Sequence, residues 1–188
     1  MRVVAGEYGG RRLRAVPGMK TRPTTDKVKE AVFNILGPYF DGGQSLDLFA
    51  GSGGLSIEGV SRGIDHAVLI DRQGAAIKTI NQNIEVTKEP DKFTVIKRDA
   101  EIALKQLQAQ HQSFDLIYFD PPYREQKIVK EIQELIASQL VNPDCRIMCE
   151  TNQEADLPAE IGACTRIVEK SYGITKITVY RYQEGDNQ

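Results

Sequence analysis

The feature that most constrains the fold is a regular alternation, from residue 45 onward, of short apolar runs with segments of helical periodicity. The apolar runs are rich in Val, Ile, Leu and Phe and show little strict alternation, as expected of strands buried on both faces. These runs are Ser45–Ala50, His66–Asp71, Phe93–Arg98, Phe114–Asp120 and Cys145–Glu150. The helical patterns between them cover residues 53–62, 74–86, 100–110 and 126–138. This order predicts an α/β domain in which helices cover both faces of a mostly parallel sheet.

Further elements are expected at both ends of the chain. Thr24 or Thr25 can cap an amphipathic helix that Gly37-Pro38 ends. The apolar runs 164–171 and 174–182 predict a closing antiparallel hairpin. Glycines and a proline interrupt the first 20 or so residues, which favours a small β-hairpin there. The 188 residues are long enough for one domain, with a hairpin arm at 1–22 and a core at 23–188.

The overall net charge is −2, but the charges are distributed unevenly along the chain. Residues 1–30 hold eight basic and three acidic side chains, whereas the other 158 residues hold 16 basic and 23 acidic ones. This asymmetry predicts a basic arm on an acidic body, suited to contact with nucleic acid. A solvated basic surface without a ligand would give the same pattern.

Composition also excludes several classes of protein. No apolar run reaches the roughly 20 residues that a membrane-spanning helix needs, and the N-terminus lacks a secretory signal, so a cytoplasmic protein is expected. The cysteines Cys145, Cys149 and Cys164 form no CxxC pair and are expected to be buried, reduced thiols. His66 and His111 lie far from one another, so a metal site is not expected.

A glycine-rich turn follows the first apolar run, in the segment Asp47-Leu48-Phe49-Ala50-Gly51-Ser52-Gly53-Gly54. Glycines there let a ligand approach the backbone, and the N-terminus of the next helix offers free N–H groups. The segment is not a Walker loop, and it departs from the full Gly-x-Gly-x-x-Gly spacing of a dinucleotide-binding motif. A tight turn between strand and helix, without a ligand, would also explain these glycines.

Acidic residues end the next two runs. Asp71 lies 20 residues after Gly51, the spacing at which a carboxylate can bind the ribose hydroxyls of an adenosine cofactor. Asp99 follows the third run and would lie at the same edge of the sheet. Asp71 could instead only cap the following helix.

The tetrapeptide Asp120-Pro121-Pro122-Tyr123, after the fourth run, indicates the chemistry. Two prolines hold the backbone extended, so the Asp120 carboxylate and the Pro121 carbonyl can both accept hydrogen bonds from one amino group. Tyr123 can lie against the ring that carries this group. The amino lone pair of a nucleobase is delocalised, and two such hydrogen bonds would favour a pyramidal, nucleophilic nitrogen without any metal. A simple turn is the alternative for this tetrapeptide alone.

These residues resemble class I S-adenosylmethionine methyltransferases that modify exocyclic amines, and more narrowly the bacterial 16S ribosomal RNA guanine-N2 methyltransferase (RsmD) family. The resemblance spans nearly the whole chain, and its N-terminal segments carry the narrower match. The matching segments are Arg2–Gly6, Gly10–Leu13, Thr21–Glu30, Asp47–Gly53 and Asp120–Tyr123.

The resemblance implies a Rossmann-like fold whose seven-stranded sheet ends in the expected hairpin. It implies S-adenosylmethionine as cofactor, with the methionine end at Phe49, Ala50, Gly51, Ser52 and Gly53. The other implied cofactor contacts are Asp47, Asp71 with the adjacent Arg72, Asp99, Ala100 and Asp120. The catalytic residues would be Asp120, Pro121 and Tyr123.

The same resemblance implies that the partner is 16S ribosomal RNA, free or in an assembling or assembled small subunit. Arg11, Arg12, Arg14, Lys20 and Arg22 would bind phosphates while the target guanine turns out of its stack into the site. The segment from Arg22 to Thr24 would border that site. A DNA or RNA adenine-N6 methyltransferase, a protein glutamine methyltransferase and a non-catalytic RNA-binding module remain alternatives. The glutamine enzymes typically have Asn at the position of Asp120.

Overall fold

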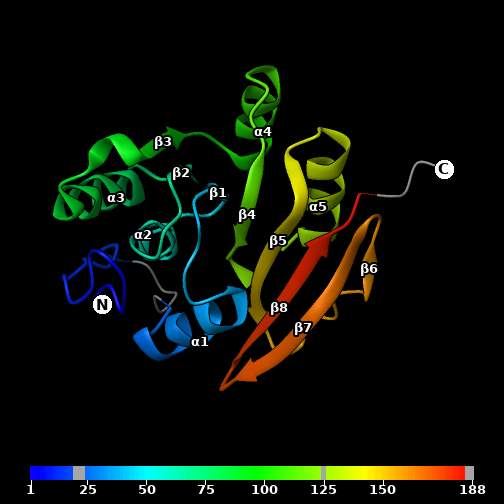
Figure 1. The fold of residues 1–188 in the computed structure, drawn as a ribbon, viewed down its shortest axis with the longest axis horizontal. Coiled ribbons are helices and arrows are strands. Elements are labelled where there is room, and N and C mark those ends of the chain that lie inside the picture. Colours follow the sequence, from blue (N-terminus) through cyan, green and yellow to red (C-terminus); the bar gives the residue numbers. More distant parts are fainter. Residues whose placement is uncertain (19–23, 124–125, 185–188) are drawn as a thin grey trace.

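In the computed structural model, which describes residues 1–18, 24–123 and 126–184, eight strands form one sheet (Figure 1). The strands are β1 Gln44–Asp47, β2 His66–Asp71, β3 Phe93–Lys97, β4 Phe114–Phe119, β5 Val141–Asn152, β6 Glu160–Ile161, β7 Cys164–Tyr172 and β8 Thr175–Tyr182. The α-helices are α1 Asp26–Leu36, α2 Gly54–Ser61, α3 Gly74–Thr87, α4 Ala100–Ala109 and α5 Ile128–Ala137. A short 3-10 helix, η1, covers Pro90–Lys92.

The strand order is β3-β2-β1-β4-β5-β8-β7-β6. The pairs among β1 to β5 are parallel, whereas β5 with β8, β8 with β7, and β7 with β6 are antiparallel. The predicted fold class and the closing hairpin are therefore confirmed. The sheet has one strand more than the seven expected. The additional strand is β6, whose two residues are too few to produce a hydrophobic pattern.

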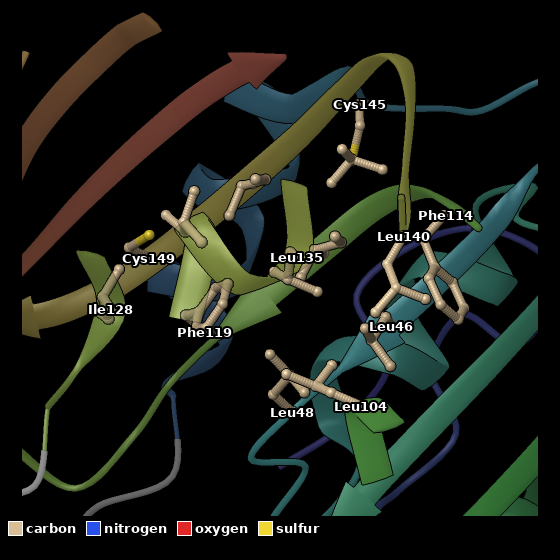
Figure 2. Close-up of a cluster of buried hydrophobic side chains, with 14 of the residues drawn as sticks. Leu46, Leu48, Leu104, Phe114, Phe119, Ile128, Leu135, Leu140, Cys145 and Cys149 are labelled. Atoms are coloured by element: carbon tan, nitrogen blue, oxygen red, sulfur yellow. The ribbon is translucent and has the colours of Figure 1, made fainter. Parts of the chain in front are cut away.

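Two apolar clusters lie between the sheet and the helices that cover its faces, one cluster on each face. The first cluster joins α4 and α5 to strand residues such as Leu46 and Phe119, as Figure 2 shows. The second joins α1, α2 and α3 to residues such as Leu69 and Tyr118. Along β4, Ile117 and Phe119 belong to the first cluster and Leu116 and Tyr118 to the second. Burial on both faces explains why the central strands show no polar alternation.

Local signals in the sequence set the ends of several helices. Thr25 caps α1, because its hydroxyl oxygen accepts a hydrogen bond of 3.2 Å from the Val28 N–H. Gly37 ends this helix with a φ of 112°. Of the two predicted caps, Thr25 is therefore the one used. No helix in the described part of the chain is long and apolar enough to cross a bilayer.

The expected N-terminal hairpin is smaller than predicted within residues 1–18. One isolated antiparallel bridge joins Arg2 and Arg12, with backbone hydrogen bonds of 2.9 Å from Val3 to Arg11 and 2.8 Å from Gly10 to Val3. The segment does not extend into two strands, because its apolar side chains are used for packing. Val3, Tyr8 and Leu13 are buried in the cluster with α2 and α3.

Gly6 shows how closely this N-terminal segment packs on the core. It has a φ of 85°, and a Cβ added there would lie 1.9 Å from the carbonyl oxygen of Ser61 at the end of α2. Only glycine satisfies both conditions. The N-terminal segment therefore packs closely on the end of α2.

The three cysteines are buried free thiols, as expected. In the described ranges, no group of three His, Cys, Asp or Glu side chains could hold a metal ion.

Candidate active site

Acidic side chains gather at one edge of the sheet. Because β1 to β5 run parallel, the carboxyl ends of these strands lie at the same edge. Asp47 ends β1, Asp71 ends β2, Asp99 follows β3, Asp120 follows β4, and Glu150 lies near the end of β5. Four of these five acids are those that the sequence singled out.

The glycine turn connects β1 to α2 at this edge. Gly51 and Gly53 have φ values of 56° and 82°, and the Gly53 N–H donates to the Ala50 carbonyl at 2.8 Å. A Cβ on Gly51 would meet nothing within 4 Å, so open space lies against the backbone here. Phe49, half-buried, packs against the cluster that includes α4 and α5, and Ser52 follows in the turn. The turn therefore has both the conformation and the space that backbone contact with a ligand requires.

Asp71 is joined directly to this turn. Its Oδ2 accepts a hydrogen bond from the Gly51 N–H at 3.0 Å, and its Oδ1 accepts one from the Gln73 N–H at 2.9 Å. Gln73 is the N-cap residue of α3 and makes no side-chain capping bond, so Asp71 does not occupy the capping position considered as its alternative role. Each Asp71 oxygen keeps a lone pair that can accept a ligand hydroxyl.

Asp47 lies beneath the turn and is fully buried, with 1% of its surface exposed. Its Oδ2 accepts from the Ser56 hydroxyl at 2.9 Å, while Oδ1 is buried without a hydrogen-bond partner among the described residues. Burial raises the pKa of Asp47 to about 7, the Ser56 hydrogen bond opposes this, and the charge of Asp71 adds to it. A buried acceptor without a partner is costly, which suggests that a ligand group completes its environment.

An open hollow of about 500 Å³ lies beyond the ends of β2 and β3. Its lining includes Arg72, Lys97, Asp99 and Ile102. Asp99 is the N-cap residue of α4, but its side chain makes no capping hydrogen bond, so its carboxylate can serve a ligand. Ala100 is the first residue of α4. Of the residues predicted to contact an adenosine, Arg72 and Asp99 line this hollow.

Asp120 and Glu150 form a pair of carboxyl groups at the neighbouring strands. The β4–β5 register pairs Phe119 with Cys149, so the next residues, Asp120 and Glu150, lie side by side. Burial raises the pKa of Asp120 well above its usual range, and the charges of Glu150 and Asp47 raise it further.

The remaining residues of the tetrapeptide lie at the surface side of this pair. Pro121 is buried and Pro122 is exposed. Tyr123 is 39% exposed. Its ring is therefore available for stacking.

The basic residues of the N-terminal segment are not equivalent. The Arg11 guanidinium donates to the carbonyls of Val86 and Thr87, both at 3.0 Å, and lies 5.2 Å from the Tyr8 ring centroid. Arg11 therefore holds the segment against the end of α3. Arg12 and Arg14 are exposed. The other two predicted RNA contacts, Lys20 and Arg22, lie outside the described residues.

Two further polar residues at the site were not predicted from the sequence. Glu150 ends an apolar run, and its position at the carboxyl end of a parallel strand was the available signal. Asn83 on α3 joins the N-terminal segment to the glycine turn, since its amide donates to the carbonyls of Arg14 at 3.0 Å and Ser52 at 2.8 Å. Asn83 carries no pattern that sequence analysis could have detected.

Comparisons with known proteins agree with this architecture. The family model described as Conserved hypothetical protein 95 matches residues 1–181. A Bacillus subtilis protein named "Putative rRNA methyltransferase YlbH" is 43% identical over 181 residues, which cover 96% of this chain and 98% of that protein. The "Ribosomal RNA small subunit methyltransferase D" of Haemophilus influenzae is 31% identical over 182 residues, covering 96% of this chain and 93% of that protein.

A solved structure described as "Putative methyltransferase yhhF from Escherichia coli" has a TM-score of 0.80 and 30% identity to this chain, and the alignment covers 97% of this chain and 98% of that one. The similarity thus extends over nearly the full length in both sequence and structure. The chain belongs to the Conserved hypothetical protein 95 family, the family of ribosomal RNA small subunit methyltransferase D (RsmD), as its sequence motifs predicted.

Proposed function

We propose that the protein is an S-adenosylmethionine-dependent methyltransferase that modifies the N2 amino group of a guanine in 16S ribosomal RNA. The observation that carries the proposal is the position of Asp120 relative to the glycine turn. β1 pairs with β4 in a register that joins Asp47 to Tyr118, so the turn after β1 and the corner after β4 begin side by side. The names of the family relatives support an RNA substrate.

The residues at the edge fit this cofactor. Asp71 would accept the ribose hydroxyls, and the hollow beside Asp99 and Ala100 would hold the adenine, with Arg72 at its border. Phe49 to Gly53 would surround the methionine part, where the space beside Gly51 is open. The free Oδ1 of Asp47 is suited to a positively charged or N–H group of the ligand. When bound, S-adenosylmethionine supplies an electrophilic methyl group on a positively charged sulfur.

The residues of the corner would act on the other reactant. Asp120 and the Pro121 carbonyl accept hydrogen bonds from the two amino hydrogens, which orients the nitrogen lone pair and favours a pyramidal nitrogen. Tyr123 stacks on the base, since its ring is partly exposed. As the nitrogen gains positive charge, the Asp120 carboxylate stabilises it and accepts a proton.

The RNA would lie across the N-terminal segment. Arg12 and Arg14 are exposed on the segment that Asn83 ties to the glycine turn, so phosphates bound there would be close to the site. Arg11 supports this surface from behind. Lys20 and Arg22 remain predicted phosphate contacts. The partner is 16S ribosomal RNA, alone or in a small-subunit particle, which places the reaction in the cytoplasm.

The alternatives differ from this proposal in testable ways. A DNA adenine-N6 methyltransferase usually needs a separate target-recognition region, and here the methyltransferase fold takes up nearly all of the described residues. A protein glutamine methyltransferase typically has Asn in place of Asp120. A non-catalytic RNA-binding module would not require the acidic edge described above.

The test supplies labelled S-adenosylmethionine to ribosomal RNA and to small-subunit particles from cells that lack this protein, followed by mapping of the modified nucleotide. We expect N2-methylguanosine at one position of 16S ribosomal RNA. Label in adenine, in DNA or in protein would overturn the substrate assignment. Binding of RNA without any label transfer would favour the non-catalytic module.

A further inference from the structure

The side chain of Asn83, on α3, links two elements of the proposed site that would bind different ligands. Asn83 is fully buried. Its Oδ1 accepts a hydrogen bond from the Arg14 N–H at 2.8 Å, and its Nδ2 donates to the carbonyls of Arg14 at 3.0 Å and of Ser52 at 2.8 Å. Arg14 belongs to the N-terminal segment that would bind RNA, and Ser52 belongs to the glycine turn that would bind the cofactor.

These hydrogen bonds require an amide at this position. Each of the two carbonyls uses one Nδ2 hydrogen, and the Arg14 N–H needs an acceptor, which fixes the orientation of the amide. An ionised carboxylate of the same shape would still accept from the Arg14 N–H, but it would face two carbonyl oxygens without a hydrogen to donate. Because polar groups left without a partner are costly, the Arg14 backbone and the Ser52 carbonyl both depend on this one side chain.

Both ends of the link lie next to surfaces that are open to a ligand. The Arg14 side chain is exposed, so the bonds from Asn83 to its backbone set where a phosphate bound to it would lie relative to the turn. Gly51, directly before Ser52, has open space beside its Cα, where the cofactor is proposed to contact the backbone. A ligand that holds the turn would therefore also hold the Ser52 carbonyl against the Asn83 amide.

Other contacts attach the segment and the turn to the core separately. Arg11 holds the segment to the end of α3, and Asp71 holds the turn to the end of β2. The Ser52 hydroxyl also lies 4.0 Å from the sulfur of Met1, which is a weak acceptor. The Asn83 amide thus provides a direct and well-oriented connection between the two elements.

We propose that Asn83 is a positioning residue that couples the two binding surfaces, so that the cofactor and the RNA bind cooperatively. The inference rests on the proposed function and adds a thermodynamic link between its two substrates. Without the cofactor, RNA binding must fix both the segment and the turn, whereas with the cofactor bound the turn is already held. By linkage, RNA must strengthen cofactor binding by the same factor.

The test measures the affinity for 16S ribosomal RNA by filter binding, with and without saturating S-adenosylhomocysteine. It compares wild type, Asn83→Asp, Asn83→Ala and the control Thr79→Ala. Thr79 is buried one turn earlier on α3, and its hydroxyl donates within the helix to the Ala75 carbonyl at 3.1 Å. In wild type and in the control, S-adenosylhomocysteine should tighten RNA binding about 5- to 10-fold. In both Asn83 variants the same addition should change the affinity less than about 2-fold.

The outcomes separate coupling from a role in stability alone. Asn83 variants that lose thermal stability but keep the wild-type ratio of the two RNA affinities would overturn the inference. A wild-type ratio near 1 would do the same. The measurement needs no turnover, because S-adenosylhomocysteine has no methyl group to transfer. A protein that shows the expected ratios but methylates no ribosomal RNA would refute the proposed reaction and not the coupling.

Discussion

Removing the Glu58 carboxylate should lower the free energy of unfolding more than any substitution at the surface, because Glu58 links three segments inside the core. It is fully buried on α2. Its two oxygens accept from the backbone N–H groups of Val4 at 2.8 Å and Ala5 at 3.1 Å. They also pair with Lys29 of α1 at 3.3 Å and with Arg62 at 2.9 Å. The N-terminal segment, α1 and the end of α2 thus converge on one side chain.

The size of the effect follows from these contacts. Glu58→Ala removes the carboxylate partner of two buried cations, which keep only the carbonyls of Arg2 and Pro38, and the acceptor of two part-buried N–H groups. Breaking a buried ion pair in this way costs about 3–5 kcal/mol. Burial already lowers the pKa of Lys29, so this lysine can lose its proton in the variant and relieve part of the cost. We therefore expect the lower half of the range, about 3–4 kcal/mol. In a domain of this size that lowers the Tm by about 6–16 °C.

Urea denaturation followed by circular dichroism measures this free energy of unfolding. The matched control is Glu134→Ala, whose side chain is 40% exposed and pairs with Lys130 at 3.9 Å. An exposed helical pair of this kind contributes about 0.3–0.5 kcal/mol. A Glu58→Ala variant within 1 kcal/mol of the control, a margin of about one ordinary hydrogen bond, would refute the reasoning that this carboxylate holds the segments together.

Three further predictions concern the site. The folded-state pKa of Asp47, about 7, lies above its unfolded value, so the contribution of Asp47 to stability is greatest below about pH 4 and falls as pH rises from about 4 to 7. Asp47→Asn should reduce this fall by about 2–4 kcal/mol, measured as unfolding free energy at several pH values. Asp71→Asn should weaken S-adenosylhomocysteine binding about 10- to 100-fold by calorimetry, whereas unchanged affinity would remove Asp71 from the cofactor site. Replacing Arg12 and Arg14 by Ala should reduce the slope of log binding constant against log salt concentration for RNA by about 2. A slope equal to that of wild type would exclude these arginines as phosphate contacts.

The fold could be predicted because its signals are local and repeated. Each parallel strand produced a continuous apolar run, and the predicted boundaries of β2 coincide with the observed ones. β5 begins at Val141, four residues before the predicted start, because Asn142, Pro143 and Asp144 interrupt its apolar pattern. The small N-terminal hairpin could be predicted from its turn residues, but these do not reveal that Val3 and Tyr8 would be buried against helices.

The site could be predicted only where chemistry follows a motif. The glycine turn, Asp71 and Asp120 have fixed relations to strand ends, and the sheet topology brings them to one edge. Contacts between distant segments have no such signature. The Thr24–Glu150 bond joins residues 126 positions apart. Glu58 on α2 anchors the N-terminal segment, and no motif marks it for this role.

The most direct test of the central claim compares wild type with Asp120→Asn in two measurements on the same protein. Calorimetry with S-adenosylhomocysteine reports cofactor binding, and single-turnover transfer to 16S ribosomal RNA reports the methylation step. If Asp120 orients the amine beside the cofactor, binding should stay within a few-fold of wild type while the transfer rate falls by about 100- to 1,000-fold. Equal transfer rates in the two proteins would contradict the account.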